Sequence, residues 1–210
     1  MIASTQLYLF MAAALALLLV PGPAVLYITA RSASQGRMAG IVSVLAIETA
    51  NLLQAVAAAL GLSAILLSSA LAFDVVKYLG AAYLIYLGVH KLLTRDDGDE
   101  KEEVKRESLS RIYWQGFFVN ILNPKTALFF FAFLPQFVDS ARGNVIGQNL
   151  MLGGIFVGMA LVTDSMYALL ASSLAERLAG NQTLQKGGRV FAGLIYIGLG
   201  ITTALAGTKK

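Results

Sequence analysis

The sequence contains no cysteine and only one histidine. The missing thiols exclude disulfides, thiolate nucleophiles and thiolate metal sites, and one imidazole cannot form a histidine-rich metal centre. Charge is also scarce, because Asp, Glu, Lys and Arg make up 13% of the 210 residues, against about a quarter in soluble domains. No nucleophile–base pair and no phosphate-binding loop is present. We therefore expect neither an enzyme nor a site for a cofactor or metal.

Apolar residues, at 57% of the chain, take the place of the missing charge. A membrane-spanning helix needs about 20 mainly apolar residues. Six segments meet this requirement, and they predict an all-α, polytopic membrane protein with six transmembrane helices embedded in the lipid bilayer. Their approximate bounds are 7–30, 38–69, 75–93, 112–138, 145–174 and 190–206.

The charged segment 94–111 divides the chain into two parts, 1–93 and 112–210, which hold three expected spans each. Most Lys and Arg residues lie after the first, third and fifth spans. The positive-inside rule places these loops, and segment 94–111 as a linker, in the cytoplasm, with both termini outside. The basic residues form no stripe with interleaved aromatics, so a net charge of +4 does not indicate nucleic-acid binding.

The two halves resemble each other in a series of matched landmarks. A unit with an odd number of spans re-enters the membrane upside down, so a repeat of three spans predicts the inverted-repeat design of many secondary transporters. The matched landmarks are Pro21 with Pro124, Glu48 with Asp164, Gly80 with Gly193, and Tyr83 with Tyr196.

Two proline motifs interrupt expected spans, Pro21-Gly22-Pro23 in the first and Asn123-Pro124-Lys125 in the fourth. Proline removes a backbone donor and clashes with the preceding turn, so each motif should break its helix. Backbone groups freed inside a membrane must meet protein, water or a ligand. Each break alone is equally well a packing kink, whereas a matched pair of breaks favours a binding site.

Three ionisable residues lie deep in expected spans: Glu48, Lys125 and Asp164. At 1.5 Å per residue they lie about 16 to 21 Å from the nearest basic residue on the expected cytoplasmic side, close to the midplane. A charge there costs at least about 2.5 kcal/mol, so a functional reason is expected. Either Lys125 neutralises one carboxylate in a structural ion pair, or one acid carries a proton during transport.

Several amides accompany these charges. Asn51 and Gln54 follow Glu48 on one helix face, and Asn120 precedes Asn123 by one turn. Such amides serve equally well as hydrogen bonds between helices or as contacts to a ligand. The candidate substrate-binding residues are accordingly Pro21, Gly22, Pro23, Asn51, Asn120, Asn123 and Pro124, with Asp164, Glu48 and Lys125 as candidate proton-coupling residues.

The chain resembles the superfamily of lysine exporters and homoserine/threonine resistance proteins. The resemblance rests on Pro21 to Pro23 followed by Arg31 to Arg37, on Lys77 to Gly88, and on Gly116 to Lys125 with Pro135 to Phe137. It implies a bacterial inner-membrane exporter of amino acids or close derivatives, driven by the proton gradient. The family's acid or histidine in the second span often stands nearer Asn51 or Gln54, whereas here the acid is Glu48.

Together these features predict an exporter that works by alternating access of two inverted three-helix units. Its partners would be a small-molecule substrate and protons, and a homo-oligomer is possible. The alternatives are a passive channel or an exporter of another solute class, and, in a different class, an intramembrane enzyme or a scaffold subunit. A proton requirement for transport would distinguish the predicted exporter from the first alternative. The missing catalytic dyad weighs against an enzyme.

Overall fold

The computed structural model describes residues 4–61, 107–139, 141 and 143–178, with 78–79, 82–83, 85–86, 89, 194, 197–198 and 201. Every regular element within these residues is helical. Most of the third and sixth expected spans lies outside them, as do most of the linker and the landmarks Gly80, Gly193 and Tyr196.

The first half begins with a bent helix pair. Helix α1 (Ser4–Leu19) ends just before the Pro-Gly-Pro motif, and α2 (Pro23–Gln35) begins inside it at an angle of 50°. Proline fits the first position of a helix because the N–H it lacks has no partner there. A turn at Gly36, with φ of +84°, then leads into α3 (Arg37–Ala59). Helix α3 ends ten residues before the expected end of the second span.

The second half begins in the same way. Helix α6 (Leu109–Ile121) is capped by the Ser108 hydroxyl, and after Asn123 the chain continues as α7 (Pro124–Leu128) at an angle of 49°. A π-helical turn, η1 (Phe129–Phe133), and a 3₁₀ turn, η2 (Leu134–Phe137), extend α7. The 34-residue α8 (Val145–Leu178) follows. Both predicted helix breaks are therefore confirmed.

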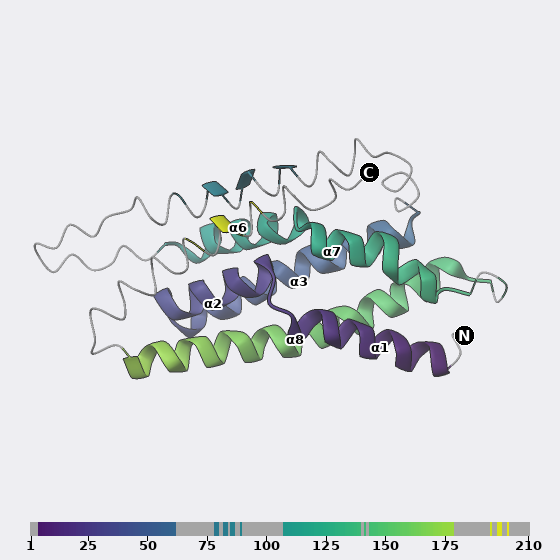
Figure 1. Cartoon of the computed structure of the whole chain (residues 1–210), viewed down its shortest axis with the longest axis horizontal. Coiled ribbons are helices and arrows are strands. Elements are labelled where there is room, and N and C mark those ends of the chain that lie inside the picture. Colours follow the sequence, from purple (N-terminus) through teal and green to yellow (C-terminus); the bar gives the residue numbers. More distant parts are fainter. Residues whose placement is uncertain are drawn as a thin grey trace, which may run out of the picture.

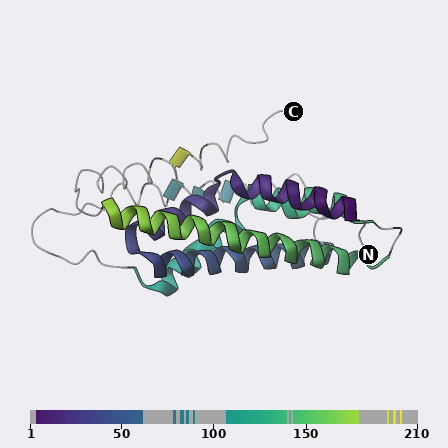
Figure 2. The same ribbon diagram turned by 90° about the horizontal axis from the view of Figure 1, so that it is seen from below.

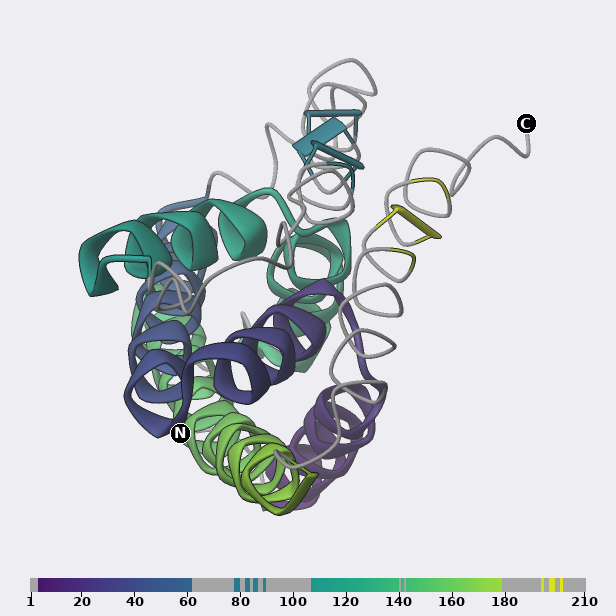
Figure 3. The same cartoon turned by 90° about the vertical axis from the view of Figure 1, so that its left-hand side faces the viewer.

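The two bent pairs run in opposite directions along the bundle (Figure 1). Seen along the bundle, α2 lies centrally, in contact with α3, α6 and α8 (Figure 3). Helix α8 extends along the whole bundle beside α3 (Figure 2). The described residues thus contain two unbroken helices long enough to cross a membrane and two bent pairs that each suit one span. The order of bent pair then long helix is the same in both halves.

Glycines at helix contacts let backbones approach closely. A Cβ atom at Gly153 of α8 would lie 2.6 Å from the Ala55 Cβ of α3. A Cβ atom at Gly116 of α6 would lie 2.9 Å from the Tyr27 ring of α2. Contacts between small residues of this kind hold helices together in a bilayer, where lipid tails compete with larger apolar side chains.

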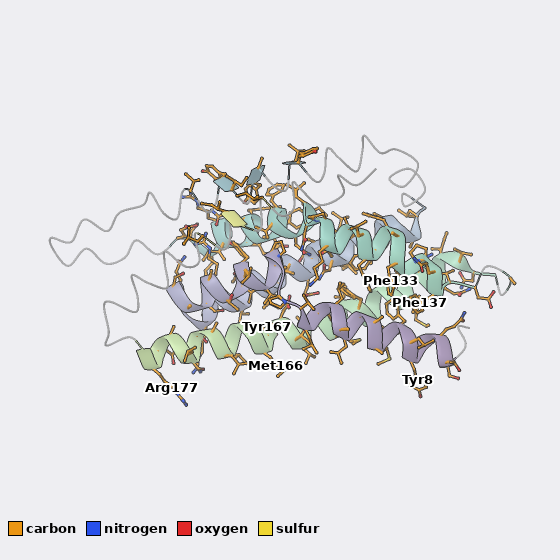
Figure 4. All side chains as sticks on the ribbon, in the orientation of Figure 1. Tyr8, Phe133, Phe137, Met166, Tyr167 and Arg177 are labelled. Carbon is orange, nitrogen blue, oxygen red and sulfur yellow. The ribbon has the colours of Figure 1, made fainter. Side chains whose placement is uncertain are left out.

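The two ends of the bundle are closed by different chemistry. At the end that carries Arg177, Arg31 of α2 forms a 3.0 Å salt bridge with Glu107, and the Tyr27 hydroxyl donates a hydrogen bond to the Ile112 carbonyl at 2.6 Å. At the opposite end, Phe133 and Phe137 belong to an apolar cluster (Figure 4). Its rings come from α1, η1, η2 and α8: Phe10, Phe129, Phe130, Phe133, Phe137 and Phe156.

We expect the salt-bridged end to face the cytoplasm, and single cysteines test this because the chain has none. Ser34→Cys at that end should react with a membrane-impermeant maleimide only in permeabilised cells. Ala141→Cys at the other end should react in intact cells, and both positions are exposed. Asn144 is avoided because its side chain caps α8 through the Gly147 N–H. The reverse labelling pattern would contradict the orientation.

Candidate functional site

The two helix breaks meet at one cavity in the middle of the bundle. Its volume is about 40 Å³, enough for a few water molecules but too small for a whole amino acid. Most of the predicted site residues line it directly, and Pro21, Pro23 and Pro124 flank it in the chain. The lining residues are Leu17, Leu18, Gly22, Ala24, Val25, Ile47, Asn51, Asn120, Asn123, Lys125, Thr126, Phe156 and Asp164.

The two buried acids, Glu48 of α3 and Asp164 of α8, form one pair near the middle of their helices. Their carboxyl groups lie close enough to act on each other. The Asn51 amide donates to Glu48 Oε2 at 3.0 Å, whereas no N–H or O–H group of the described residues donates to Glu48 Oε1. A carboxylate has no donor of its own, so a hydrogen bond between two carboxyl groups requires one proton between them. That this pair carries a proton during transport stays a prediction.

Lys125 does not form the ion pair that the sequence left open. Within the described residues no salt bridge joins it to Glu48 or Asp164, although Asp164 is near enough to act on its charge. Its Nζ instead donates to the carbonyl oxygens of Leu17, at 2.8 Å, and Val20, at 2.5 Å. These carbonyls belong to the last turn of α1 and the residue beyond it, where a helix leaves acceptors unsatisfied and favours a cation.

A second side chain from the other half of the protein satisfies the same helix end. The Tyr167 hydroxyl of α8 donates to the Leu19 carbonyl at 3.1 Å. Three carbonyls at the first break, those of Leu17, Leu19 and Val20, are thus bonded by side chains of the second half. Tyr167 follows Asp164 by three positions and so shares its helix face, a signal that sequence reasoning passed over.

The amides between α3 and α6 form a closed network around Asn120. Its Nδ2 donates to the Ile47 carbonyl, at 3.0 Å, and to Asn51 Oδ1, at 2.7 Å. Its Oδ1 accepts from Thr126, at 3.1 Å, and from Asn123, at 3.4 Å. Asn120 therefore fixes one helix against another as well as lining the cavity, and a contact with a ligand stays a prediction. Thr126, three residues beyond Asn123, was missed from the sequence although the spacing could have revealed it.

The cavity has electrically different sides. Helix α2 starts at Pro23, so the N–H groups of Ala24 and Val25 at the cavity wall have no acceptor within their own helix. Helix N-termini carry partial positive charge and favour anions. The acid pair and the α1 carbonyls favour cations. The arrangement suits a small solute that carries a positive group and, at a short distance, a negative one.

A polar cavity at paired helix breaks, in the middle of an apolar bundle, is the architecture of a secondary transporter. The family model described as LysE type translocator matches residues 15–207, and the chain belongs to this family. It is therefore a membrane transporter and not an enzyme.

Two relatives illustrate the range of the similarity. The membrane protein YrhP of Bacillus subtilis is 32% identical over 199 residues, which cover 90% of this chain and 94% of that protein. The homoserine/homoserine lactone efflux protein of Salmonella typhimurium is 28% identical over 179 residues, which cover 85% of this chain and 86% of that protein. No solved structure matches the chain significantly.

Proposed function

We propose that this protein exports amino acids or closely related amines across the bacterial inner membrane in exchange for protons. The observation that carries the proposal is the cavity where both helix breaks meet a proton-holding pair, Glu48 and Asp164. Family membership supports the transport of a small solute, and the efflux protein of Salmonella supports the outward direction.

The substrate class follows from what the relative's two cargoes have in common. Homoserine and homoserine lactone both carry an α-ammonium group, but only homoserine has a free carboxylate. A site that accepts both must recognise the ammonium, and the acid pair and the α1 carbonyls supply acceptors for it. A carboxylate, where present, would lie towards the N-terminus of α2.

Coupling follows from competition at the acid pair. From the cytoplasm, a solute ammonium binds as the pair releases its proton inward. On the outer side, a proton returns to the pair and the ammonium leaves. The bent pairs run in opposite directions, which supports two inverted units, 1–93 and 112–210 joined by 94–111, that alternate access to the cavity.

Purified protein in vesicles provides the test. Vesicles loaded with homoserine, homoserine lactone or other amino acids should release the transported solute faster when the outside is acidic. Release that ignores the proton gradient would indicate a passive channel and contradict the coupling. If no amine or amino acid leaves under any gradient, the proposed substrate class is wrong.

A further inference from the structure

We propose that Lys125 is a built-in competitor of the substrate: its ammonium fills the subsite for the solute's ammonium and must be displaced for the solute to bind. The inference rests on the proposed function for the identity of the displacing group. The subsite itself, a cation site at the broken end of α1, rests on geometry alone.

The contacts of Nζ define an ammonium site. Two carbonyl oxygens, of Leu17 and Val20, accept from it, and no third acceptor of the described residues lies within hydrogen-bonding distance. Lys125 and Leu17 both line the cavity, so a free ammonium could reach the same place. A lysine side chain ends in the group that amino acids and simple amines carry. The protein thus holds a tethered primary ammonium where a mobile one would bind.

Gly22 makes room for this arrangement. A Cβ atom at Gly22 would lie 3.1 Å from Lys125 Cδ and 3.5 Å from Nζ. The backbone at Gly22, with φ of −127° and ψ of −171°, is one that any residue adopts. The requirement for glycine is therefore space for the lysine stem. Gly22 therefore serves two purposes at the first helix break: it lies at the bend between α1 and α2, and it leaves space for the Lys125 side chain.

A change in the charge of the acid pair explains how the Lys125 ammonium can leave the carbonyls of α1. In the described residues, the carboxyl group that acts on Lys125 is Asp164 of α8, with Glu48 of α3 beyond it, and the Tyr167 hydroxyl lies at the same end of α1. With one proton, the pair carries one negative charge and balances Lys125. When the pair loses that proton, the second negative charge attracts Lys125 towards Asp164 and frees the α1 carbonyls. The bound solute ammonium then replaces the single positive charge that the pair lost with its proton.

The test shortens the Lys125 side chain and supplies the missing part as a free ion in solution. Lys125→Ala deletes the equivalent of propylammonium, so this ion should bind the purified variant and raise its melting temperature by a few degrees. Wild-type protein should need a higher concentration of the ion for the same rise, because the tethered ammonium competes at millimolar or higher effective concentration. Tetramethylammonium, which has no N–H donor, is the matched salt control.

A second variant keeps the proposal testable should Lys125→Ala fail to fold. Lys125→Met retains an apolar stem and lacks only the charged end, so the ammonium ion should stabilise it and propylammonium should not. The proposal is overturned if neither variant responds to its matching ion beyond the salt control, or if wild type responds at the same concentrations. The melting temperatures test only the ammonium site. The export proposal is tested separately, by efflux from vesicles.

Discussion

Replacing Asp164 with asparagine is expected to reduce proton-driven export to the level of protein-free vesicles. The asparagine amide can still donate a hydrogen bond to Glu48, so the contact between α3 and α8 is retained, but it cannot take up or release a proton. Exchange of internal for external solute moves no net proton and should survive. Efflux and exchange measured in the same reconstituted vesicles, over a range of pH, separate the two activities.

Glu48→Gln is the matched control for this prediction. Glu48 is already bonded to Asn51 and does not line the cavity, so its replacement should mainly weaken folding or affinity and leave gradient-driven export measurable. Proton-driven export with an unchanged pH profile in both variants would show that neither acid carries the proton.

Asn120→Ala should cause a large loss of stability, about 3 kcal/mol or more. The substitution removes four hydrogen bonds and leaves the Ile47 carbonyl, Asn51 Oδ1 and the Asn123 amide short of partners. Each buried polar group left unsatisfied costs about 1–3 kcal/mol. Unfolding in detergent, followed by tryptophan fluorescence or circular dichroism, measures the difference.

Asn149→Ala provides the comparison. Asn149 is also a buried asparagine, but its amide donates only to Val145 of its own helix and its Oδ1 has no partner within the described residues. Its loss should change stability by less than about 1 kcal/mol. Similar losses for the two variants would mean that the network around Asn120 does not hold α3 and α6 together.

The sequence was sufficient for features that depend on local composition. Apolar length predicted the spans that the structure describes, and proline predicted the break in each bent pair, because a missing N–H acts within one turn. Helical rise alone predicted similar depths for Glu48 and Asp164. Helical spacing placed Asn51 and Glu48 on one helix face, and the structure shows a hydrogen bond between them.

The sequence was not sufficient for contacts that depend on how helices pack. Glu48 and Asp164 were expected at similar depths, but only the packing of α3 against α8 makes them a pair. An ion pair between Lys125 and a carboxylate was one of the two alternatives that the sequence left open. The sequence did not show that the carbonyls of Leu17 and Val20, at the end of α1, would accept hydrogen bonds from Lys125 Nζ. Arg31 was likewise read only as a topology signal, yet it forms a salt bridge with Glu107 of the linker.

The π-helical turn at Phe129–Phe133 sets the phase of the segment that follows it. A π turn contains about one residue more than an α turn, and one residue corresponds to about 100° of rotation. Residues beyond it therefore face a direction that an uninterrupted α-helix would give to their neighbours. This rotation places the Phe137 ring 5.4 Å from the Phe10 ring of α1. Deleting or inserting one residue in the π turn would rotate Phe137 away from α1 without moving the helix axis.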